Sequence, residues 1–180
     1  MFEDIKSIYK NDPAAKNIEF LLYPSLHVIV VHRYISHPLH RIKIPFIPRL
    51  ISQIMRFLTG IEIHPGAQIG KGFFIDHGMG TVIGETVEIG KNCVMFHNVT
   101  LGGTGKHKGK RHPTLGDNVT IGTGAILIGR VKIGNNVKIG ADTFIINKNI
   151  PDNCTVVGTP GKIVRPKNKK VNIELKQNGK

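Results

Sequence analysis

The spacing of apolar residues divides the chain into two parts that meet near residue 60. In the first part apolar positions recur at helical spacing, and no repeat is present. A first helix is expected from Ser25, which suits an N-cap, to about Ser36. Its apolar face comprises Leu26, Ile29, Val30 and Tyr34. A second helix is expected between Pro48, which suits a first turn, and Gly60, which suits a stop. We expect its apolar stripe to pack within the protein; the stripe comprises Leu50, Ile51, Ile54, Met55, Phe57 and Leu58.

From Ile63 onward the pattern changes to a six-residue repeat. Aliphatic-glycine pairs recur, mostly at multiples of six, and they begin at Ile69, Ile83, Ile89, Leu101, Leu115, Ile121, Ile133, Ile139 and Val157. Neither the helical period of 3.6 residues nor the strand period of two explains this spacing. A hexapeptide repeat is typical of a parallel β-helix, in which three hexads form a triangular coil of about 18 residues. The sequence therefore predicts a mainly β protein, with about five coils over residues 61–165 in the left-handed form known for this motif, after a small helical region at 1–60.

The repeat slips at two places, and we expect functional residues there. After Ile75 the next pair begins two residues late, and the extra residues fall within 77–80. After Leu101 the next pair is delayed until Leu115, so a polar loop over residues 102–113 must leave the coil. Long polar excursions from a regular scaffold are common sites of binding and catalysis.

Composition narrows the class of protein. The chain has 180 residues, 25 Lys+Arg against 12 Asp+Glu, a formal charge of +13, and 40% hydrophobic residues, which is enough for a folded core. Cys93 and Cys154 give neither a disulfide framework nor a C-x-x-C metal motif, and we expect buried fillers rather than nucleophiles. No apolar run approaches the roughly 20 residues of a membrane span, and the acidic start lacks a signal-peptide pattern, so a cytoplasmic protein is expected. The basic residues within 162–180 suit a solvated tail, a polyanion site or a ligand rich in phosphate groups.

His77 and the Arg111–His112 pair are the strongest candidates for chemistry. His77 follows Asp76 at the first slip, on the rigid coil, whereas Arg111 and His112 lie near the end of the polar loop. A base on the scaffold and a cationic pair on a loop suit attack on an acyl group, with a carboxylate ligand bound nearby. From spacing alone, a purely structural role for these residues remains an alternative. The histidines within 27–40 and His97 are expected to have structural or surface roles.

Three segments resemble serine O-acetyltransferases, which are hexapeptide-repeat acyltransferases that use acetyl-CoA. The segments are IEIHPGAQIGKGFFIDHGMGTVIGETVEIG (61–90), VTLGGTGKHKGKRHPTLG (99–116) and VVGTPGKIVRP (156–166), and the likeness extends back to NDPAA (11–15). The motifs DHGMG and GKRHP narrow the resemblance from the superfamily to this activity. The compact N-terminal region is similar to the short forms of the family. The resemblance implies acetyl transfer to the L-serine hydroxyl, giving O-acetyl-L-serine and CoA in cysteine biosynthesis.

The resemblance also implies catalytic roles. His77 would be the general base that removes the serine hydroxyl proton and returns it to the departing CoA thiolate. Glu62 would orient the His77 imidazole, at a position where many family members carry Asp. His112 would help to stabilise the tetrahedral oxyanion. Direct transfer without an acyl-enzyme is expected, because neither cysteine is a candidate nucleophile.

Substrate contacts follow from the same resemblance. The residues that would form the serine site are Asp12 and Asp76 at the ammonium, Arg111 and His112 at the carboxylate, and Pro13 and Gly103 around the pocket. The residues that would contact CoA are Thr123 and Ala141 along its groove and Lys162 and Arg165 at its phosphates. Acetyl-CoA would be a co-substrate, and neither a metal nor a tightly bound cofactor is implied.

The resemblance extends to assembly and regulation. Family members place the active site between neighbouring subunits of a trimer, so a homotrimer or a dimer of trimers through the N-terminal helices is expected. L-cysteine, which keeps the ammonium and carboxylate of serine, is expected to inhibit at the serine site. Members that bind the next enzyme of cysteine synthesis use a C-terminal isoleucine, and the ending Asn178-Gly179-Lys180 argues against that complex. Neither a nucleic acid nor a membrane is expected as a partner.

Three alternatives stay open at this point. The first is a hexapeptide acetyltransferase that acts on a sugar or xenobiotic hydroxyl. The second is a zinc-dependent carbonic anhydrase on a similar β-helix, which needs three convergent histidines; His77 and His112 would supply two, and the sequence does not place a third. The third is a polyanion-binding protein whose site is the basic segment 167–180.

Overall fold

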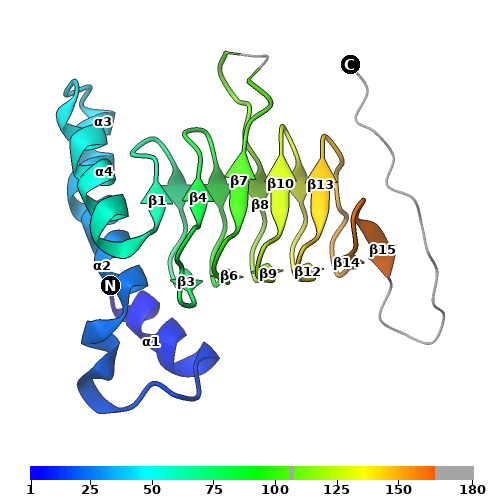
Figure 1. The fold of residues 1–180 in the computed structure, drawn as a ribbon, viewed down its shortest axis with the longest axis horizontal. Coiled ribbons are helices and arrows are strands. Elements are labelled where there is room, and N and C mark those ends of the chain that lie inside the picture. Colours follow the sequence, from blue (N-terminus) through cyan, green and yellow to red (C-terminus); the bar gives the residue numbers. More distant parts are fainter. Residues whose placement is uncertain (106–107, 165–180) are drawn as a thin grey trace.

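The computed structural model describes residues 1–105 and 108–164. Within them a helical region precedes a stack of coils, and Figure 1 shows the helices covering the end of the stack at which the first coil lies. The expected parallel β-helix of about five coils behind a small helical region is confirmed. Arg165 and the basic segment 166–180 lie outside the described residues, as do Lys106 and His107 of the polar loop.

The helical region has the expected extent but contains more helices than the two that were expected. Its segments are α1 (Phe2–Asn11), the 3₁₀ helix η1 (Asn17–Leu22), α2 (Pro24–Val31), the π-helix η2 (His32–Ser36), α3 (His37–Arg41) and α4 (Ile47–Thr59). The helix expected over 25–36 is present, but it continues through η2 into α3. The expected cap at Ser25 is wrong: Tyr23 is the N-cap and Pro24 occupies the first turn, where its fixed φ and missing N–H suit the helix. Tyr34 is exposed and does not belong to the buried face.

Helix α4 has the expected bounds but not the expected packing. Pro48 lies in its first turn, and Gly60 ends it with a φ of +71°, a conformation that favours glycine. Much of the apolar stripe is exposed, and Phe57 is 89% exposed. The helix instead turns a face with small polar residues to the first coil, where Ser52 donates a hydrogen bond of 2.6 Å to the carbonyl of Ile63. The prediction that the stripe packs within the chain is therefore wrong for its exposed members, which are Leu50, Ile54, Phe57 and Leu58.

The strands form three sheets, one on each face of the prism. Sheet A contains β1 (Glu62–Ile63), β4 (Val82–Ile83), β7 (Thr100–Gly102), β10 (Ile126–Ile128) and β13 (Phe144–Ile146). Sheet B contains β2 (Gln68–Ile69), β5 (Glu88–Ile89), β8 (Thr114–Leu115) and β11 (Lys132–Ile133). Sheet C contains β3 (Phe74–Ile75), β6 (Val94–Met95), β9 (Thr120–Ile121), β12 (Lys138–Ile139), β14 (Thr155–Val157) and β15 (Lys162–Val164). The described pairings are parallel apart from β14 with β15, which closes the last coil as an antiparallel pair.

The inward aliphatic residues fill the prism as the repeat predicts. Ile83, Leu101 and Leu127 have no exposed surface, which is the burial that stabilises each coil on the next. The last pair is misplaced by one residue: Val156 points inward and Val157 is 41% exposed. The reason is the register, because Ile139 pairs with Val156 and the final coil is one residue short.

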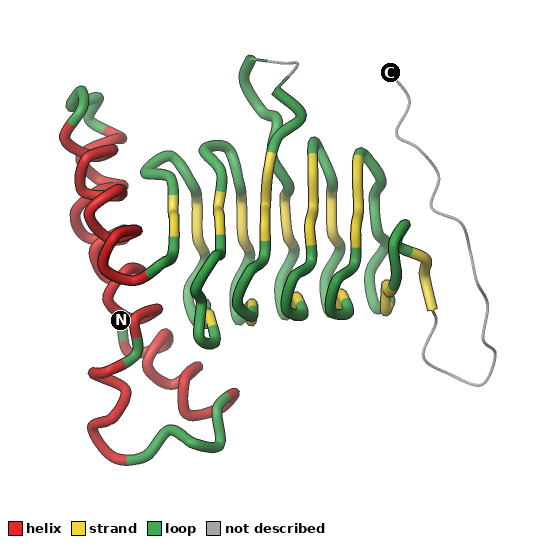
Figure 2. The backbone as a smooth tube through the Cα atoms, in the orientation of Figure 1, coloured by secondary structure: helices red, strands yellow, loops and turns green. Residues whose placement is uncertain are grey.

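The two slips of the repeat lengthen two coils. Val82 pairs with Thr100 one regular coil further on. Glu62 pairs with Val82 across a coil that is two residues longer, and Thr100 pairs with Ile126 across a coil that is eight residues longer. Figure 2 shows the second insertion leaving the stack between β7 and β8, whereas the neighbouring coils keep their outline. The scaffold therefore stays regular while both insertions present polar residues at its edges.

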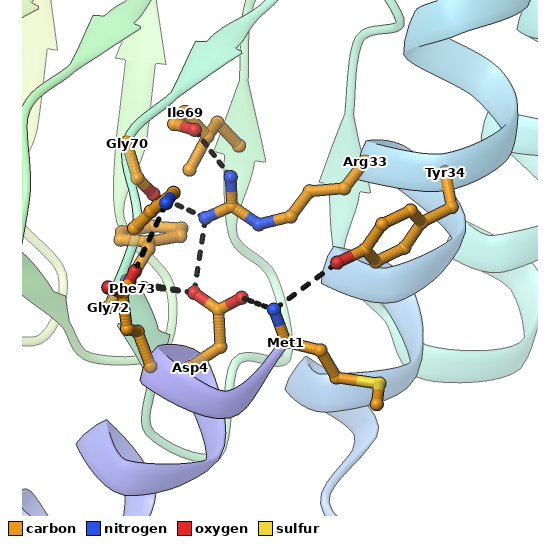
Figure 3. A network of polar contacts seen from close by, with 10 residues as sticks. Met1, Asp4, Arg33, Tyr34, Ile69, Gly70, Gly72 and Phe73 are labelled. Atoms are coloured by element: carbon orange, nitrogen blue, oxygen red, sulfur yellow. Dashed lines mark hydrogen bonds and ion pairs between the residues drawn. The ribbon is translucent and has the colours of Figure 1, made fainter.

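Asp4 fastens α1 to the coils. Its carboxylate is nearly buried and accepts hydrogen bonds from Arg33 Nη2 at 3.1 Å and from the backbone N–H groups of Gly72 at 2.9 Å and Phe73 at 3.2 Å (Figure 3). A buried carboxylate needs such partners, because an unpaired buried charge is strongly unfavourable. The network fixes α1 on the stack and with it Asp12, which directly follows this helix.

Candidate active site

The candidate residues lie on two edges of the prism, one on each side of sheet A. The turn between β3 and β4 carries His77, and the loop between β7 and β8 carries Arg111 and His112. Figure 1 shows these two segments at opposite ends of the sheet A strands. About five or six residues of extended chain, at roughly 3.3 Å each, separate the edges by about 15–20 Å. We call them the His77 edge and the Arg111 edge, and within one chain they are separate half-sites.

The turn that carries His77 has an unusual backbone. His77 has a φ of +58°, and the N–H of Gly78 bonds back to the carbonyl of Asp76 at 2.6 Å. Other corners use Asn in this conformation, as at Asn98 and Asn118, because Asn adopts positive φ more readily than most residues. Histidine at such a corner projects an imidazole that is 78% exposed, with Nε2 3.9 Å from Oδ1 of Asp76. The first slip thus presents a base on a rigid turn.

Asp12 brings a second carboxylate to the His77 edge. Oδ2 of Asp12 accepts a hydrogen bond from the phenol of Tyr23, and Oδ1 accepts one of 2.8 Å from the N–H of Ala14. These bonds, that of Tyr23 first, lower the pKa of Asp12, and a positive charge on His77 lowers it further. The same bond raises the pKa of Tyr23 to about 12. Asp12 is therefore ionised at neutral pH near the imidazole of His77, which lies 3.9 Å from Asp76 on its own turn.

Successive coils extend the His77 edge. The rings of His77 and His97 meet edge to face with centroids 6.0 Å apart, and His97 Nε2 lies 2.8 Å from Oγ1 of Thr123. The carbonyl of Thr123 accepts a hydrogen bond of 2.9 Å from Asp142, which follows the exposed Ala141 on the next coil. The predicted CoA residues Thr123 and Ala141 thus share an edge with the predicted base. The exposed Lys162 begins β15 at the far end of the stack.

Arg111 belongs to the second half-site, the Arg111 edge. Its Nη2 atom donates to Oε2 of Glu85, and this hydrogen bond lowers the pKa of the Glu85 carboxyl. The neighbouring Lys110 forms an ion pair of 3.0 Å with Glu88. Glu85 and Glu88 therefore bind Arg111 and Lys110 of the loop. The half-buried guanidinium of Arg111 stays at the edge of sheet A.

His112 is packed more closely than the two residues before it, Lys110 and Arg111. It is 8% exposed, and burial, followed by the charge of Arg111, lowers the pKa of its imidazole. A Cβ added at Gly84 would lie 2.1 Å from Cδ2 of His112, and one added at Gly103 would lie 3.3 Å from its Nε2. The ring therefore occupies space that only glycine at position 84 leaves free, and Gly103 lies against both Arg111 and His112.

Glu62 and Pro13 complete the set of predicted residues. Glu62 accepts a hydrogen bond of 2.7 Å from Arg49 and forms an ion pair of 3.5 Å with Arg56, both on α4. Among the contacts of the described residues, none joins Glu62 to His77. Pro13 is exposed beside Asp12.

Sequence reasoning missed four residues at the half-sites. Tyr23 precedes the expected helix and carries no motif, and His97 is expected to have only a structural or surface role. Glu85 and Thr86 follow an ordinary aliphatic-glycine pair, and nothing in the local pattern marks them. The length of the coil that contains the polar loop could have located Glu85. In that coil Glu88 pairs with Thr114. The turn before Glu88, which contains Glu85, therefore lies beside the end of the loop, just before Thr114.

The described residues contain no group of three or more His, Cys, Asp or Glu side chains arranged to hold a metal ion. Burial raises the pKa of the Cys93 thiol to about 11, which leaves little thiolate at neutral pH. Across residues 1–105 and 108–164, every helix is too short or too polar to cross a membrane.

Comparison with known proteins first defines the class. Residues 112–147 match the family model described as "Bacterial transferase hexapeptide (six repeats)". Together with the three-sheet coil, this match identifies a hexapeptide-repeat transferase. The chain is 54% identical over 175 residues to the serine acetyltransferase of Bacillus subtilis (strain 168), an alignment that covers 96% of this chain and 80% of that protein. With the serine acetyltransferase of Helicobacter pylori (strain ATCC 700392 / 26695) it shares 51% identity over 162 residues, covering 89% of this chain and 94% of that protein. The chain belongs to the serine acetyltransferase family.

Solved structures agree with this assignment. The Neisseria gonorrhoeae serine acetyltransferase in complex with serine has a TM-score of 0.86 and 39% identity, covering 91% of this chain and 66% of that chain. The Brucella abortus enzyme in complex with coenzyme A has a TM-score of 0.86 and 35% identity, again covering 91% and 66%. Entamoeba histolytica serine acetyltransferase 1 in complex with L-cysteine has a TM-score of 0.82 and 40% identity, covering 87% and 61%. This chain spans about two thirds of the length of these solved relatives or slightly less.

Proposed function

We propose that this chain transfers the acetyl group of acetyl-CoA to the hydroxyl of L-serine, giving O-acetyl-L-serine and CoA. The observation that carries the proposal is the His77 edge, where an exposed imidazole stands beside the carboxylates of Asp12 and Asp76. An amino acid substrate supplies an ammonium for the carboxylates and a hydroxyl for the base. Relatives of known structure bind serine and coenzyme A, which supports both substrates.

His77 acts as the general base in this proposal. Its imidazole takes the hydroxyl proton of serine while the serine oxygen forms a bond to the thioester carbonyl carbon. The tetrahedral intermediate then collapses, the carbon–sulfur bond breaks, and the proton on His77 goes to the CoA thiolate. The transfer is direct, because the buried Cys93 has a pKa too high for a nucleophilic thiolate. Catalysis by a positioned base of this kind contributes about 10²–10⁴-fold in rate.

The Arg111 edge of a neighbouring copy completes the site. Arg111 binds the serine carboxylate with its planar guanidinium, and His112 donates a hydrogen bond to the oxyanion. The separation of about 15–20 Å between the two edges of one chain exceeds the size of serine, so both edges contact one serine only when they come from two copies. A homotrimer meets this requirement with three equivalent sites, since each copy offers one edge of each kind to its neighbours.

The remaining residues of the proposal extend these half-sites. Thr123 and Ala141 line the groove for CoA along the His77 edge, and Lys162 and Arg165 contact its phosphates. Pro13 and Gly103 shape the serine pocket. Glu62 orients His77 in the assembled site, which requires its carboxylate to leave one of its partners on α4, which are Arg49, Gln53 and Arg56.

L-cysteine occupies the same site as an inhibitor. It keeps the ammonium and carboxylate that Asp12, Asp76 and Arg111 recognise, and it replaces only the hydroxyl oxygen by sulfur. A solved relative is in complex with L-cysteine. A pocket that recognises substrates mainly through those charges cannot strongly reject this analogue.

The test is thiol release from acetyl-CoA with and without L-serine. Serinamide, which lacks the carboxylate, and N-acetyl-L-serine, which lacks the ammonium, serve as matched substrates, together with a panel of sugar and xenobiotic hydroxyls. Among these acceptors we expect only L-serine to give rapid thiol release from acetyl-CoA. For each truncated analogue kcat/KM should fall by at least about tenfold, because an unpaired charge remains in the site. A preference for a sugar or xenobiotic hydroxyl would overturn the proposal.

A further inference from the structure

Thr86 holds the end of the polar loop against the coil through hydrogen bonds. Its hydroxyl oxygen accepts hydrogen bonds from the backbone N–H groups of Arg111 at 3.0 Å and His112 at 3.2 Å. Its carbonyl accepts a hydrogen bond of 2.6 Å from Nζ of Lys110. Three successive residues of the loop are thus attached to one threonine, which lies in the turn between β4 and β5.

Thr86 also makes two contacts with the His112 ring. The backbone N–H of Thr86 donates to Nδ1 of His112 at 3.2 Å, and Oγ1 of Thr86 lies 2.9 Å from the same atom. A hydroxyl has one proton and two acceptor positions. The two backbone N–H groups fill both acceptor positions of Oγ1, so its proton points to Nδ1.

The protonation of the His112 ring follows from these donors. A backbone N–H only donates, so Nδ1 must present a lone pair to Thr86, and the hydroxyl proton reaches the same lone pair. A neutral imidazole has one N–H, and with Nδ1 as acceptor the proton is on Nε2. Burial and the charge of Arg111 lower the pKa of His112, which favours this neutral form at pH 7.

The Nε2 atom lies on the side of the ring that faces the glycines. A Cβ at Gly84 would lie 2.3 Å from Nε2 and one at Gly103 would lie 3.3 Å from it. Across residues 1–105 and 108–164, the hydrogen bonds of the His112 ring go to Nδ1 and none to Nε2. The donor that Thr86 creates is thus left available to a ligand.

We propose that Thr86 is a positioning residue for the transferase reaction: it fixes the His112 ring as the Nε2–H tautomer and aims that N–H at the developing oxyanion. The inference rests on the proposed function, because it is acetyl transfer that supplies the oxyanion. Fixing a donor before the reaction removes the need to reorganise it during the reaction, and this preorganisation is a main source of catalysis by hydrogen-bond donors.

Kinetics of Thr86 variants test the role. Thr86→Val keeps the shape and the backbone N–H but removes the hydroxyl, and we expect kcat to fall by about 10–100-fold with little change in the KM for acetyl-CoA. Thr86→Ser restores the hydroxyl and should recover kcat to within about threefold of the parent value. Thr120→Val on sheet C is the matched control and should keep the parent kcat. A parental kcat in Thr86→Val, or a Thr86→Ser variant no better than Thr86→Val, would overturn the proposal.

Nitrogen NMR of the parent protein provides a readout that does not depend on activity. In protein with ¹⁵N-labelled histidine, the His112 signals are assigned by comparison with His112→Gln. We expect Nδ1 to resonate as an unprotonated nitrogen and Nε2 as a protonated one, and the two signals to move toward each other in Thr86→Val. A protonated Nδ1 in the parent would contradict the inference. If the protein gave the expected spectrum but had no serine-dependent activity, the Nε2–H tautomer would be supported and the proposed function would be overturned.

Discussion

The phenol of Tyr23 donates a hydrogen bond to Oδ2 of Asp12, and it joins the first helical segments to the candidate serine site. The Tyr23 ring lies 6.2 Å from that of Phe74, a buried residue of β3, so the phenol is held by the coil itself. This hydrogen bond is the largest of the contributions that lower the pKa of Asp12, so it keeps the carboxylate ionised and in a fixed place.

Tyr23→Phe should weaken serine binding. We expect the KM for serine to rise by about 3–10-fold, because the variant loses one hydrogen bond to a charged group. The KM for acetyl-CoA should stay unchanged. The pKa of Asp12 should rise when its main lowering contact is lost, and an NMR titration of the Asp12 carboxyl carbon measures that rise.

Tyr9→Phe is the control for that variant. Tyr9 is on α1, and its phenol donates to the carbonyl of Asn17 rather than to a carboxylate. It should leave the serine KM and the pKa of Asp12 at their parental values. If Tyr23→Phe behaved like this control, Asp12 would not owe its position and charge to the phenol.

His77→Ala should abolish most turnover. Removal of a positioned general base lowers the rate by about 10²–10⁴-fold. Affinity for CoA, measured by calorimetry, should survive, since the imidazole acts on the serine hydroxyl. His27→Ala, at an exposed position of α2, should retain the parental rate. Near-normal turnover in His77→Ala would remove this residue from the mechanism.

Arg111→Lys should separate the two substrates. Lysine keeps the charge but not the planar pair of donors that matches a carboxylate. We expect the KM for serine to rise by at least about tenfold while the KM for acetyl-CoA changes by less than about twofold. Steady-state kinetics with each substrate varied in turn measure both values. Equal effects on the two would assign the loop to CoA binding instead.

Acid should destabilise the junction between helices and coils. Burial lowers the pKa of His32 to about 3 and that of His64 to about 4, while both have a pKa of about 6.5 when unfolded. The unfolded chain therefore binds more protons between pH 6.5 and 4, and the free energy of unfolding should fall as the pH falls through that range. Melting temperatures across the range measure the slope.

A variant assigns part of that slope to one histidine. His32→Gln keeps a donor for the carbonyl of Ala67, which His32 Nε2 contacts at 3.1 Å, but it does not titrate. It should flatten the dependence of melting temperature on pH, whereas His27→Gln should leave it unchanged. A slope in His32→Gln equal to that of the parent would show that His32 does not contribute.

The fold was predictable because the repeat leaves few alternatives. Each inward aliphatic residue identifies one strand on a face of the prism. The slips after Ile75 and Leu101 mark the two places where extra residues leave the regular coil. The position of Val156 was missed because a coil shortened by one residue gives no local signal. The packing of α4 was also missed: its polar Ser52 bonds to the coil through a carbonyl that no hydrophobic pattern reveals.

The candidate site was predictable in its residues but not in its arrangement. Asp76 and His77 stand together in the sequence, as do Arg111 and His112, so each half-site could be found from a motif. The distance between the half-sites depends on which corner of the prism each slip occupies. Tyr23 joins the site through a phenol at the end of a helical segment, and apolar periodicity describes that segment without indicating this contact.

The central claim is that His77 of one copy and His112 of another act on the same substrate. The most direct measurement is serine-dependent thiol release by His77→Ala and His112→Ala chains, each alone and after co-expression in equal amounts. If each site combines one edge from each of two copies, random assembly should restore activity in about one quarter of the sites, although each variant alone is nearly inactive. A mixture no more active than the mean of the two separate variants would contradict the shared site.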